Sequence, residues 1–378
     1  MSFTHAGTNR ETNLKNRVQG VVFGSACGDA LGGPLEGLDH IVIARDAGPL
    51  DGLRPYTKPR SEHAQFTQEA GSVTDDTRLH FITIEAIASR GGHDVLAGDL
   101  ALAIAEWREA HTAPLERAFI EEYHLAGLYG DAKAPWGGHA TNGAIMSNHA
   151  VGVLHAADPY GAYRAAYDLA YISDGYGKEA AAMHASAVAA AFCEGASPES
   201  MVETALNVAN HERRDGPLWR HTVQQHDWAR FEGRPNHELV ERALAIIKMY
   251  PYATKQKDRV RQELYEALYV SPVGSDAGQT LAVAFAMLIW TAGDPVATLV
   301  ECVAYGRDND SYASVAGALV GALYGRSSLP VEWIKRIESA NPSLDFSGAC
   351  DRLLGATLRR HALRKAACQA VERLNESV

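Results

Sequence analysis

The sequence has few cysteines, and none of them stand in pairs. Its five cysteines are scattered along 378 residues without a C-x-x-C spacing, which argues against a zinc ribbon and against a disulfide framework. Such isolated thiols suit the reducing cytoplasm. The chain also lacks an apolar run of the roughly 18 residues that a membrane span requires, and its polar N-terminus lacks the apolar core of a signal peptide. We therefore expect a soluble cytoplasmic protein with no membrane partner.

Clustered positive charge is absent as well. The formal net charge is −11, and no stretch is rich in lysine and arginine. Binding of nucleic acid depends on clustered cations that neutralise phosphates, so nucleic acid is not expected as a partner. The sequence contains no HExxH, no G-x-S-x-G and no P-loop pattern. Its sixteen histidines are scattered, and we interpret them as surface or core residues rather than metal ligands.

Runs that alternate between apolar and polar residues, as β-strands do, are rare. Apolar residues at helical spacing instead recur through most of the chain, which predicts an all-α fold. The helices show no fixed repeat period, so a solenoid is disfavoured. Without a clear linker, we expect a flexible N-terminal arm over residues 1–12 and a single domain over residues 13–378.

Several local signals mark the ends of the expected helices. A helix should begin at Leu14 and end at the Gly-Gly-Pro of residues 32–34, with one flank nearly bare of side chains. Residues 36–70 are rich in Gly, Pro and Asp and are predicted to be a long loop, of the kind that often forms a lid or a binding loop. Residues 212–235 are predicted to be a loop-rich connection, and residues 350–374 an amphipathic helix.

Two predicted helices begin with clusters of acidic and hydroxyl side chains. One begins with Thr74, Asp75, Asp76 and Thr77, where Ser72 or Thr74 suits the N-cap, and the other begins with Asp308, Asn309, Asp310 and Ser311. An aspartate in a first helical turn is ordinary capping, which alone would explain either case. Four carboxylates at two such starts are harder to explain this way, because they would repel one another and raise one another's pKa values.

A pair of hard divalent cations would remove this repulsion. Mg²⁺ and Mn²⁺ prefer oxygen ligands in octahedral geometry, which aspartate, threonine or serine hydroxyls and water can supply. We therefore predict that the two acidic helix starts converge in space on two such ions.

A third segment offers a place for a nucleotide-like group. Asn142 and Gly143 form a turn that leads into a helix beginning with Ala144, Ile145 and Met146. Backbone N–H groups at a helix start can receive an anion such as phosphate. Trp136, close to this turn, could stack on a base or simply pack in the core.

The chain resembles the ADP-ribosylglycohydrolase family, which includes dinitrogenase-reductase-activating glycohydrolases and ADP-ribosyl hydrolases. The likeness rests on GSACGDALGGPLEG at residues 24–37, SVTDDT at 72–77 and GRDNDSYASVAGALVGALYG at 306–325, with a weaker match in ATNGAIM at 140–146. The blocks follow the family's order along most of the chain. They are specific for the family but not for a substrate.

The resemblance implies a compact, orthogonal helical bundle with a binuclear Mg²⁺ or Mn²⁺ centre in a cleft. By position, the implied metal ligands are Thr74, Asp75, Asp76, Asp308, Asp310 and Ser311. Asp310 would bridge the ions, and Glu36 would lie on a mobile loop over the cleft. Asp76 or Glu36 would handle a proton in catalysis. The implied substrate-binding residues are Glu36, Trp136, Asn142, Gly143, Ala144 and Met146.

The implied reaction is hydrolysis of the bond between ribose C1 and the group it carries, through an oxocarbenium-like transition state. The chain departs from the family pattern at Ser311, where threonine is usual, at Ser147, where arginine is common, and near residues 173–177, where a Thr-His pair is missing. Arg307 adds a cation that could pair with a carboxylate, contact phosphate or form a surface salt bridge.

Three functions therefore stay open. The substrate could be an ADP-ribosylated protein, or it could be a nucleoside or another small ribosylated metabolite. The third alternative is a non-catalytic member that binds ADP-ribose or a nucleotide, or that has a structural role.

Overall fold

The fold is built from helices. The computed structural model describes residues 13–56, 68–113, 117, 120–121, 123, 141–173, 175–212, 236–270 and 274–376. Within these ranges the only extended pairings are two isolated bridges, Asp39 with Gly306 and Thr141 with Asp276, so the all-α prediction is confirmed. In the same ranges, no helix has both the length and the apolar composition that crossing a membrane requires.

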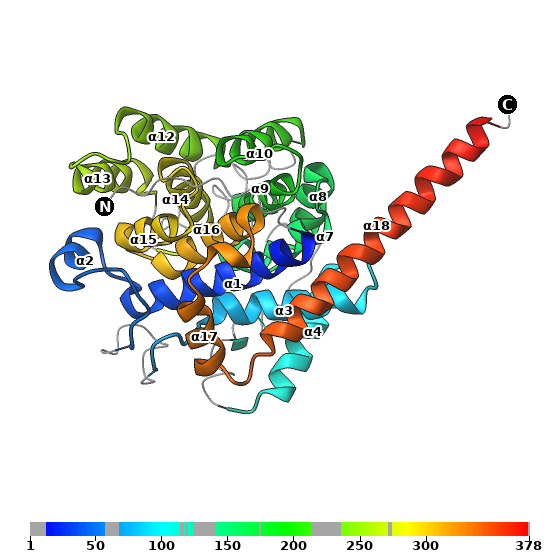
Figure 1. The fold of residues 1–378 in the computed structure, drawn as a ribbon, viewed down its shortest axis with the longest axis horizontal. Coiled ribbons are helices and arrows are strands. Elements are labelled where there is room, and N and C mark those ends of the chain that lie inside the picture. The colour runs from blue at the N-terminus through cyan, green and yellow to red at the C-terminus, as the bar shows by residue number, and fades with distance from the viewer. Residues whose placement is uncertain are drawn as a thin grey trace.

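The helices follow one another along the chain with short connections (Figure 1). Their bounds in the first half are α1 Leu14–Gly32, η1 Gly33–Leu35, α2 His40–Asp46, α3 Asp75–Ser89, α4 Ala97–Ala110, α6 Gly143–Ser147, α7 His149–Leu154, α8 Pro159–Leu169 and α9 Tyr176–Ala191. In the second half they are α10 Pro198–Glu212, α12 Asn236–Met249, α13 Lys257–Leu268, α14 Ala277–Trp290, α15 Pro295–Tyr305, α16 Asn309–Tyr324, η3 Arg326–Ser328, α17 Val331–Ala340 and α18 Phe346–Glu376.

The central contact of the fold joins α1 to α16, which lie side by side although they are nearly 300 residues apart (Figure 1). Glycines on the flank of α1 let the two backbones touch. A Cβ atom on Gly24 would lie 2.2 Å from the carbonyl oxygen of Gly317, and one on Gly32 would lie 2.4 Å from the Cα of Asp310. No side chain fits at these points. The seam therefore fixes the first turn of α16 against the last turn of α1.

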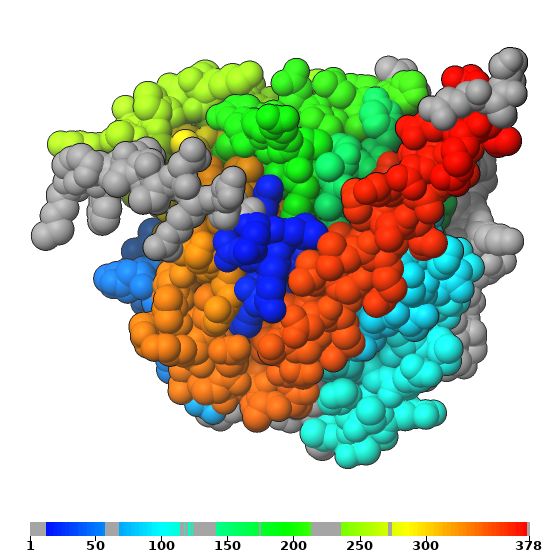
Figure 2. All heavy atoms as spheres, turned by 45° about the vertical axis from the view of Figure 1, so that its right-hand side comes forward, coloured from blue at the N-terminus to red at the C-terminus, as the bar shows by residue number. Residues whose placement is uncertain are grey.

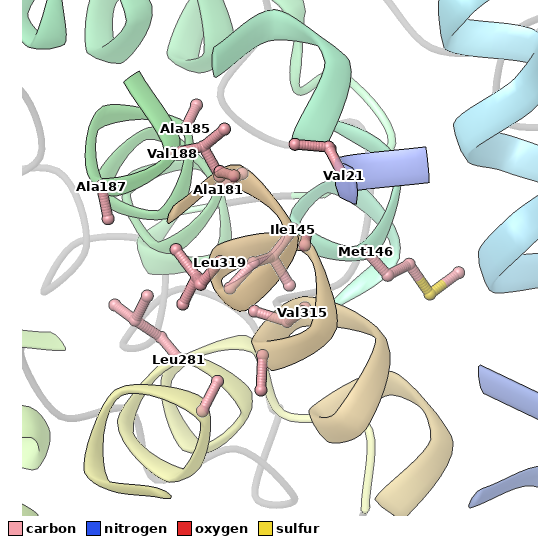
Figure 3. Close-up of a cluster of buried hydrophobic side chains, with 14 of the residues drawn as sticks. Val21, Ile145, Met146, Ala181, Ala185, Ala187, Val188, Leu281, Val315 and Leu319 are labelled. Atoms are coloured by element: carbon pink, nitrogen blue, oxygen red, sulfur yellow. The ribbon is translucent and has the colours of Figure 1, made fainter. Parts of the chain in front are cut away.

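The apolar core surrounds α16, which is buried over residues 309–323. Figure 3 shows Val315 and Leu319 of α16 among side chains from neighbouring helices, including Ile145 of α6, Val188 of α9 and Leu281 of α14. Close packing of this kind leaves little freedom for α16 to shift or rotate. The polar residues at its N-terminus are thus held by a rigid element.

Two sequence-based expectations need comment. The segment predicted as a loop over residues 36–70 contains the helix α2, whose N-cap Asp39 accepts a hydrogen bond from the Val42 N–H at 2.8 Å. That part of the prediction was wrong, because the surrounding Gly, Pro and Asp residues hid a helix of only seven residues. The arm over residues 1–12 and most of the predicted connection, residues 213–235, lie outside the described residues.

Candidate metal centre

The two acidic helix starts meet. Thr74 is the N-cap of α3, and its side chain accepts a hydrogen bond from the Asp76 N–H at 3.4 Å. Asp308 is the N-cap residue of α16. The Ser311 hydroxyl, in the first turn of α16, donates to Asp76 Oδ2 at 3.1 Å. The structure thus brings together two turns that are separated by more than 200 residues of sequence.

Asp29, on the glycine-rich helix α1, holds the first of these turns in place. Its fully buried carboxylate accepts hydrogen bonds from the backbone N–H groups and the hydroxyls of both Thr74 and Thr77. Burial raises the pKa of Asp29 to about 6, although these hydrogen bonds act to lower it. The Thr74 hydroxyl donates its proton to Asp29, so only its oxygen lone pairs could reach a metal ion.

Three carboxylates converge next to this turn. Carboxylate oxygens of Glu36, Asp308 and Asp310 all lie within 4.8 Å of one another, and no other group of this kind occurs among the described residues. Asp310 is buried, whereas Glu36 and Asp308 are half-buried. Glu36 therefore lies close enough to share a cation with the two aspartates, a role that the sequence had not assigned to it.

The segment that carries Glu36 is tied to the turn before α16. The Gly37 N–H donates to the carbonyl oxygen of Arg307, and the Arg307 N–H donates to that of Leu38, both at 2.6 Å. These bonds hold Glu36 in register with Asp308. The mobile loop that the resemblance implied is, at this point, hydrogen-bonded on both sides.

The carboxylates at the site are poorly neutralised by their surroundings. Burial, followed by the charges of neighbouring acids, raises the pKa of Asp76 and that of Asp310 well above the usual range. The same causes raise the pKa of Glu36 to about 8. Asp76 Oδ1 is buried and accepts no hydrogen bond in the described part of the chain. A buried carboxylate oxygen without a donor fits a hard divalent cation, which would also lower these pKa values.

The predicted substrate-binding turn supports the acids instead of pointing at an open space. The Asn142 side-chain amide donates to Asp308 Oδ2 at 2.5 Å and to Thr280 Oγ1 at 3.1 Å. The Ala144 N–H, expected to receive an anion, donates to the Ser173 hydroxyl at 3.0 Å. Asn142 thus orients a metal-site carboxylate.

The remaining predicted residues lie around this turn. Met146 is 2% exposed, and its sulfur accepts a weak hydrogen bond from the Ser311 hydroxyl at 3.7 Å. Gly143 lies close to the ring of Tyr123, which a Cβ would meet at 3.0 Å. The Tyr123 hydroxyl donates to Asp75 at 2.9 Å. Trp136 lies outside the described residues.

A cleft of about 430 Å³ opens beside the carboxylates. Its lining residues are Glu36, Gly37, Asp39, Tyr265, Tyr269, Gly274, Ser275, Arg307 and Asp308. Two of the three convergent acids therefore face this space. The tyrosines had not been predicted, because only their positions four residues apart at the end of an amphipathic helix signalled a shared face.

Arg307 is a buried member of the cleft wall. It is 6% exposed, so a surface salt bridge is excluded. Its guanidinium lies 4.6 Å from the ring centroid of Tyr269 and donates to Gln279 Oε1 at 2.8 Å. Its φ of 63° lies in the left-handed region, which costs a non-glycine residue about 1 kcal/mol. The burial and the contacts offset that strain.

Comparison with known proteins agrees with this geometry. The sequence model of the ADP-ribosylglycohydrolase family matches residues 10–363. A curated relative, the "Uncharacterized protein YegU" of Escherichia coli (strain K12), is 23% identical over 358 residues, which cover 92% of this chain and 99% of the relative. A solved structure titled "ADP-ribosylglycohydrolase-related protein complex" matches 92% of this chain and 99% of its own with a TM-score of 0.57. At 20% identity, that match shows the fold alone.

Proposed function

Because the chain belongs to the ADP-ribosylglycohydrolase family, we propose that it is a metal-dependent hydrolase that cleaves the glycosidic bond at ribose C1 of an ADP-ribosyl group. The observation that carries this proposal is the convergence of Glu36, Asp308 and Asp310 beside a buried Asp76 oxygen that lacks a donor. Such a set is costly without a cation.

The donor set suits two Mg²⁺ or Mn²⁺ ions. We assign Asp76, Asp310 and Ser311 to the buried side of the site, and Asp75, Asp308 and Thr74 to its rim. Bound ions would orient the ribose hydroxyls and lower the pKa of a water. Asp29 and Asn142 would keep the ligating groups in place, since ligands to a metal need partners that fix their orientation.

The protein's own groups would then manage charge and protons. The oxygen of a water bonds to C1 as the C1–N or C1–O bond breaks, one water proton passes to a carboxylate, and the leaving group takes up a proton. We assign the proton to Glu36, because it lines the cleft, whereas Asp76 is 2% exposed and accepts a hydrogen bond from Ser311. Nearby carboxylates also stabilise positive charge that develops on the sugar.

A small ribosylated metabolite is the second candidate substrate. The cleft is about 430 Å³ and has two tyrosine rings on its wall, a size and lining typical of sites for small ligands. Such a site would accept a planar leaving group beside the ribose. A cytoplasmic location suits either substrate, since all five cysteines are free.

The test is a substrate panel with purified protein and Mn²⁺. Peptides that carry ADP-ribosyl-arginine or ADP-ribosyl-serine would be compared with a set of nucleosides, and release of ADP-ribose or ribose would be measured. Release from one class identifies the substrate. If no compound is cleaved but ADP-ribose binds, the non-catalytic alternative replaces this proposal.

A further inference from the structure

The second half of α18 extends away from the rest of the protein (Figure 1). Every residue from His361 to Asn375 is exposed. Figure 2 shows this part of the helix continuing beyond the edge of the protein at the upper right. An isolated helix of this length is only marginally stable in water. The extension also lies almost wholly beyond residue 363, where the match to the family ends.

One face of α18 is apolar along its whole length. In the first half, Ala349, Leu353 and Ala356 are buried on this face, where α18 packs on α1, α3 and α7. The same spacing of three and four residues continues on the extension through Leu363, Ala367, Ala370 and Leu374. Leu363 is 45% exposed and Leu374 is 70% exposed. The packing surface therefore continues beyond the part of the protein that it covers.

We propose that this stripe, Leu363, Ala367, Ala370 and Leu374, pairs with the same stripe of a second copy of this chain, in antiparallel orientation. Alanines at its centre let two helices approach closely. The stripe has too few large apolar side chains for a membrane-surface helix, which uses tryptophan, phenylalanine and leucine. A surface that must match itself about a two-fold axis also favours a second copy.

The spacing fits this pairing residue by residue. An antiparallel arrangement that sets Ala367 against Ala370 of the second copy also sets Leu363 against Leu374 of that copy. The extension of about 16 residues is roughly 24 Å long, and each copy supplies the same length. The end of one helix then reaches Arg360 of the other, the point where α18 rejoins the body and pairs with Asp94.

Charge favours the antiparallel orientation. Arg360, Arg364 and Lys365 lie at the start of the extension, and Glu372 lies near its end. The C-terminus of a helix also carries partial negative charge. Antiparallel pairing brings these opposite charges to the same level, whereas parallel pairing would place like beside like. The contact is near the lower size limit for stable interfaces, about 1,000 Å², so we expect association in the micromolar range.

Sedimentation of the full chain over a range of concentrations tests the pairing. We expect the wild type to form dimers, and Ala367→Glu with Ala370→Glu to weaken dimerisation at least about tenfold, because charges would enter an apolar seam. The matched control, Gln369→Glu with Asn375→Glu, adds the same charge outside the stripe and should still dimerise. A monomeric wild type, or dimers that survive Ala367→Glu with Ala370→Glu, would overturn the proposal.

Cysteine cross-linking tests the orientation. The exposed Cys193 and Cys368 would first be replaced by serine. Leu363→Cys with Leu374→Cys should then give a cross-linked dimer on oxidation, whereas Leu363→Cys alone should not, because its two copies would lie about 16 Å apart. Cross-linking by the single variant would contradict the antiparallel register. None of these variants touches the carboxylate site, so the outcome is independent of whether the protein is a hydrolase.

Discussion

Two clusters of buried titratable side chains lie in this protein, and they deal with burial in opposite ways. One is the carboxylate group around Glu36, Asp76 and Asp310. The other, here called the histidine cluster, consists of His80, His149 and His184, all fully buried. His149 Nδ1 and His184 Nε2 are 2.7 Å apart, and the ring centroid of His80 lies 4.8 Å from that of His149. Both clusters contain buried polar atoms without a partner in the described residues.

The difference lies in what neutrality costs at physiological pH. Burial lowers the pKa of His80 and of His184 to about 3, so these imidazoles stay neutral without an ion. The carboxylates can become neutral near pH 7 only by holding protons far above their ordinary pKa or by binding a cation. They also face a cleft, whereas the imidazoles are sealed in the core. Burial of titratable groups alone therefore does not mark a site; access together with unbalanced charge does.

The comparison can be broken most strongly at the carboxylates. Asp76→Asn and Asp308→Asn should each lower kcat by about 1,000-fold or more, because each removes charge that holds a cation. Circular dichroism should show an unchanged helical fold. Asp51→Asn, at an exposed position, is the control and should keep full activity. Full activity of the wild type in EDTA would contradict the metal role.

Metal should stabilise one cluster and ignore the other. At about 100 times the dissociation constant, Mn²⁺ should add about 2.7 kcal/mol to the free energy of unfolding. Asp310→Asn should lose most of this gain, whereas His184→Phe should keep it. Chemical unfolding with and without Mn²⁺ measures both. An equal loss in the two variants would mean that the ion binds elsewhere.

The metal-free protein should become less stable as pH rises from 6.5 to 8. A carboxyl whose folded pKa is raised contributes stability below its unfolded pKa, and this contribution is lost as pH rises through the folded value. The pKa of Glu36, about 8, sets the window, and the expected loss is about 2 kcal/mol. Saturating Mn²⁺ should reverse the slope, since metal binding favours the deprotonated groups. A metal-free protein that gains stability over this range would contradict the raised pKa.

The histidine cluster should show the opposite slope at lower pH. A histidine with a lowered folded pKa contributes stability above its unfolded pKa of about 6.5, and this contribution is lost as pH falls towards the folded value. His80→Phe removes one such group, so at pH 5.5 it should be about 1 kcal/mol more stable relative to wild type than at pH 7. His93→Phe, at an exposed position, is the control. Unfolding in urea at both pH values gives the comparison.

The sequence predicted those features of the site that depend on neighbours along the chain. Thr74 caps its helix as expected, because a hydroxyl followed by two acids is a local signal. Glu36 joining Asp308 and Asp310, and Asp29 clamping the threonines, depend on distances that only packing sets. Tyr265 and Tyr269 reached the cleft for the same reason. The C-terminal helix, expected over residues 350–374, was found at Phe346–Glu376, because its apolar spacing is regular.

The backbone contact between α1 and α16 constrains how the chain can change. Gly317 and Asp310 lie on the same helix, and both are fixed against α1 through Gly24 and Gly32. A single residue inserted between Asp310 and Gly317 would rotate the aspartate by about 100° and direct it away from Glu36. Substitution in this interval is open wherever side chains fit, but a change in its length is not. Gaps in an alignment of active relatives should therefore avoid these seven positions.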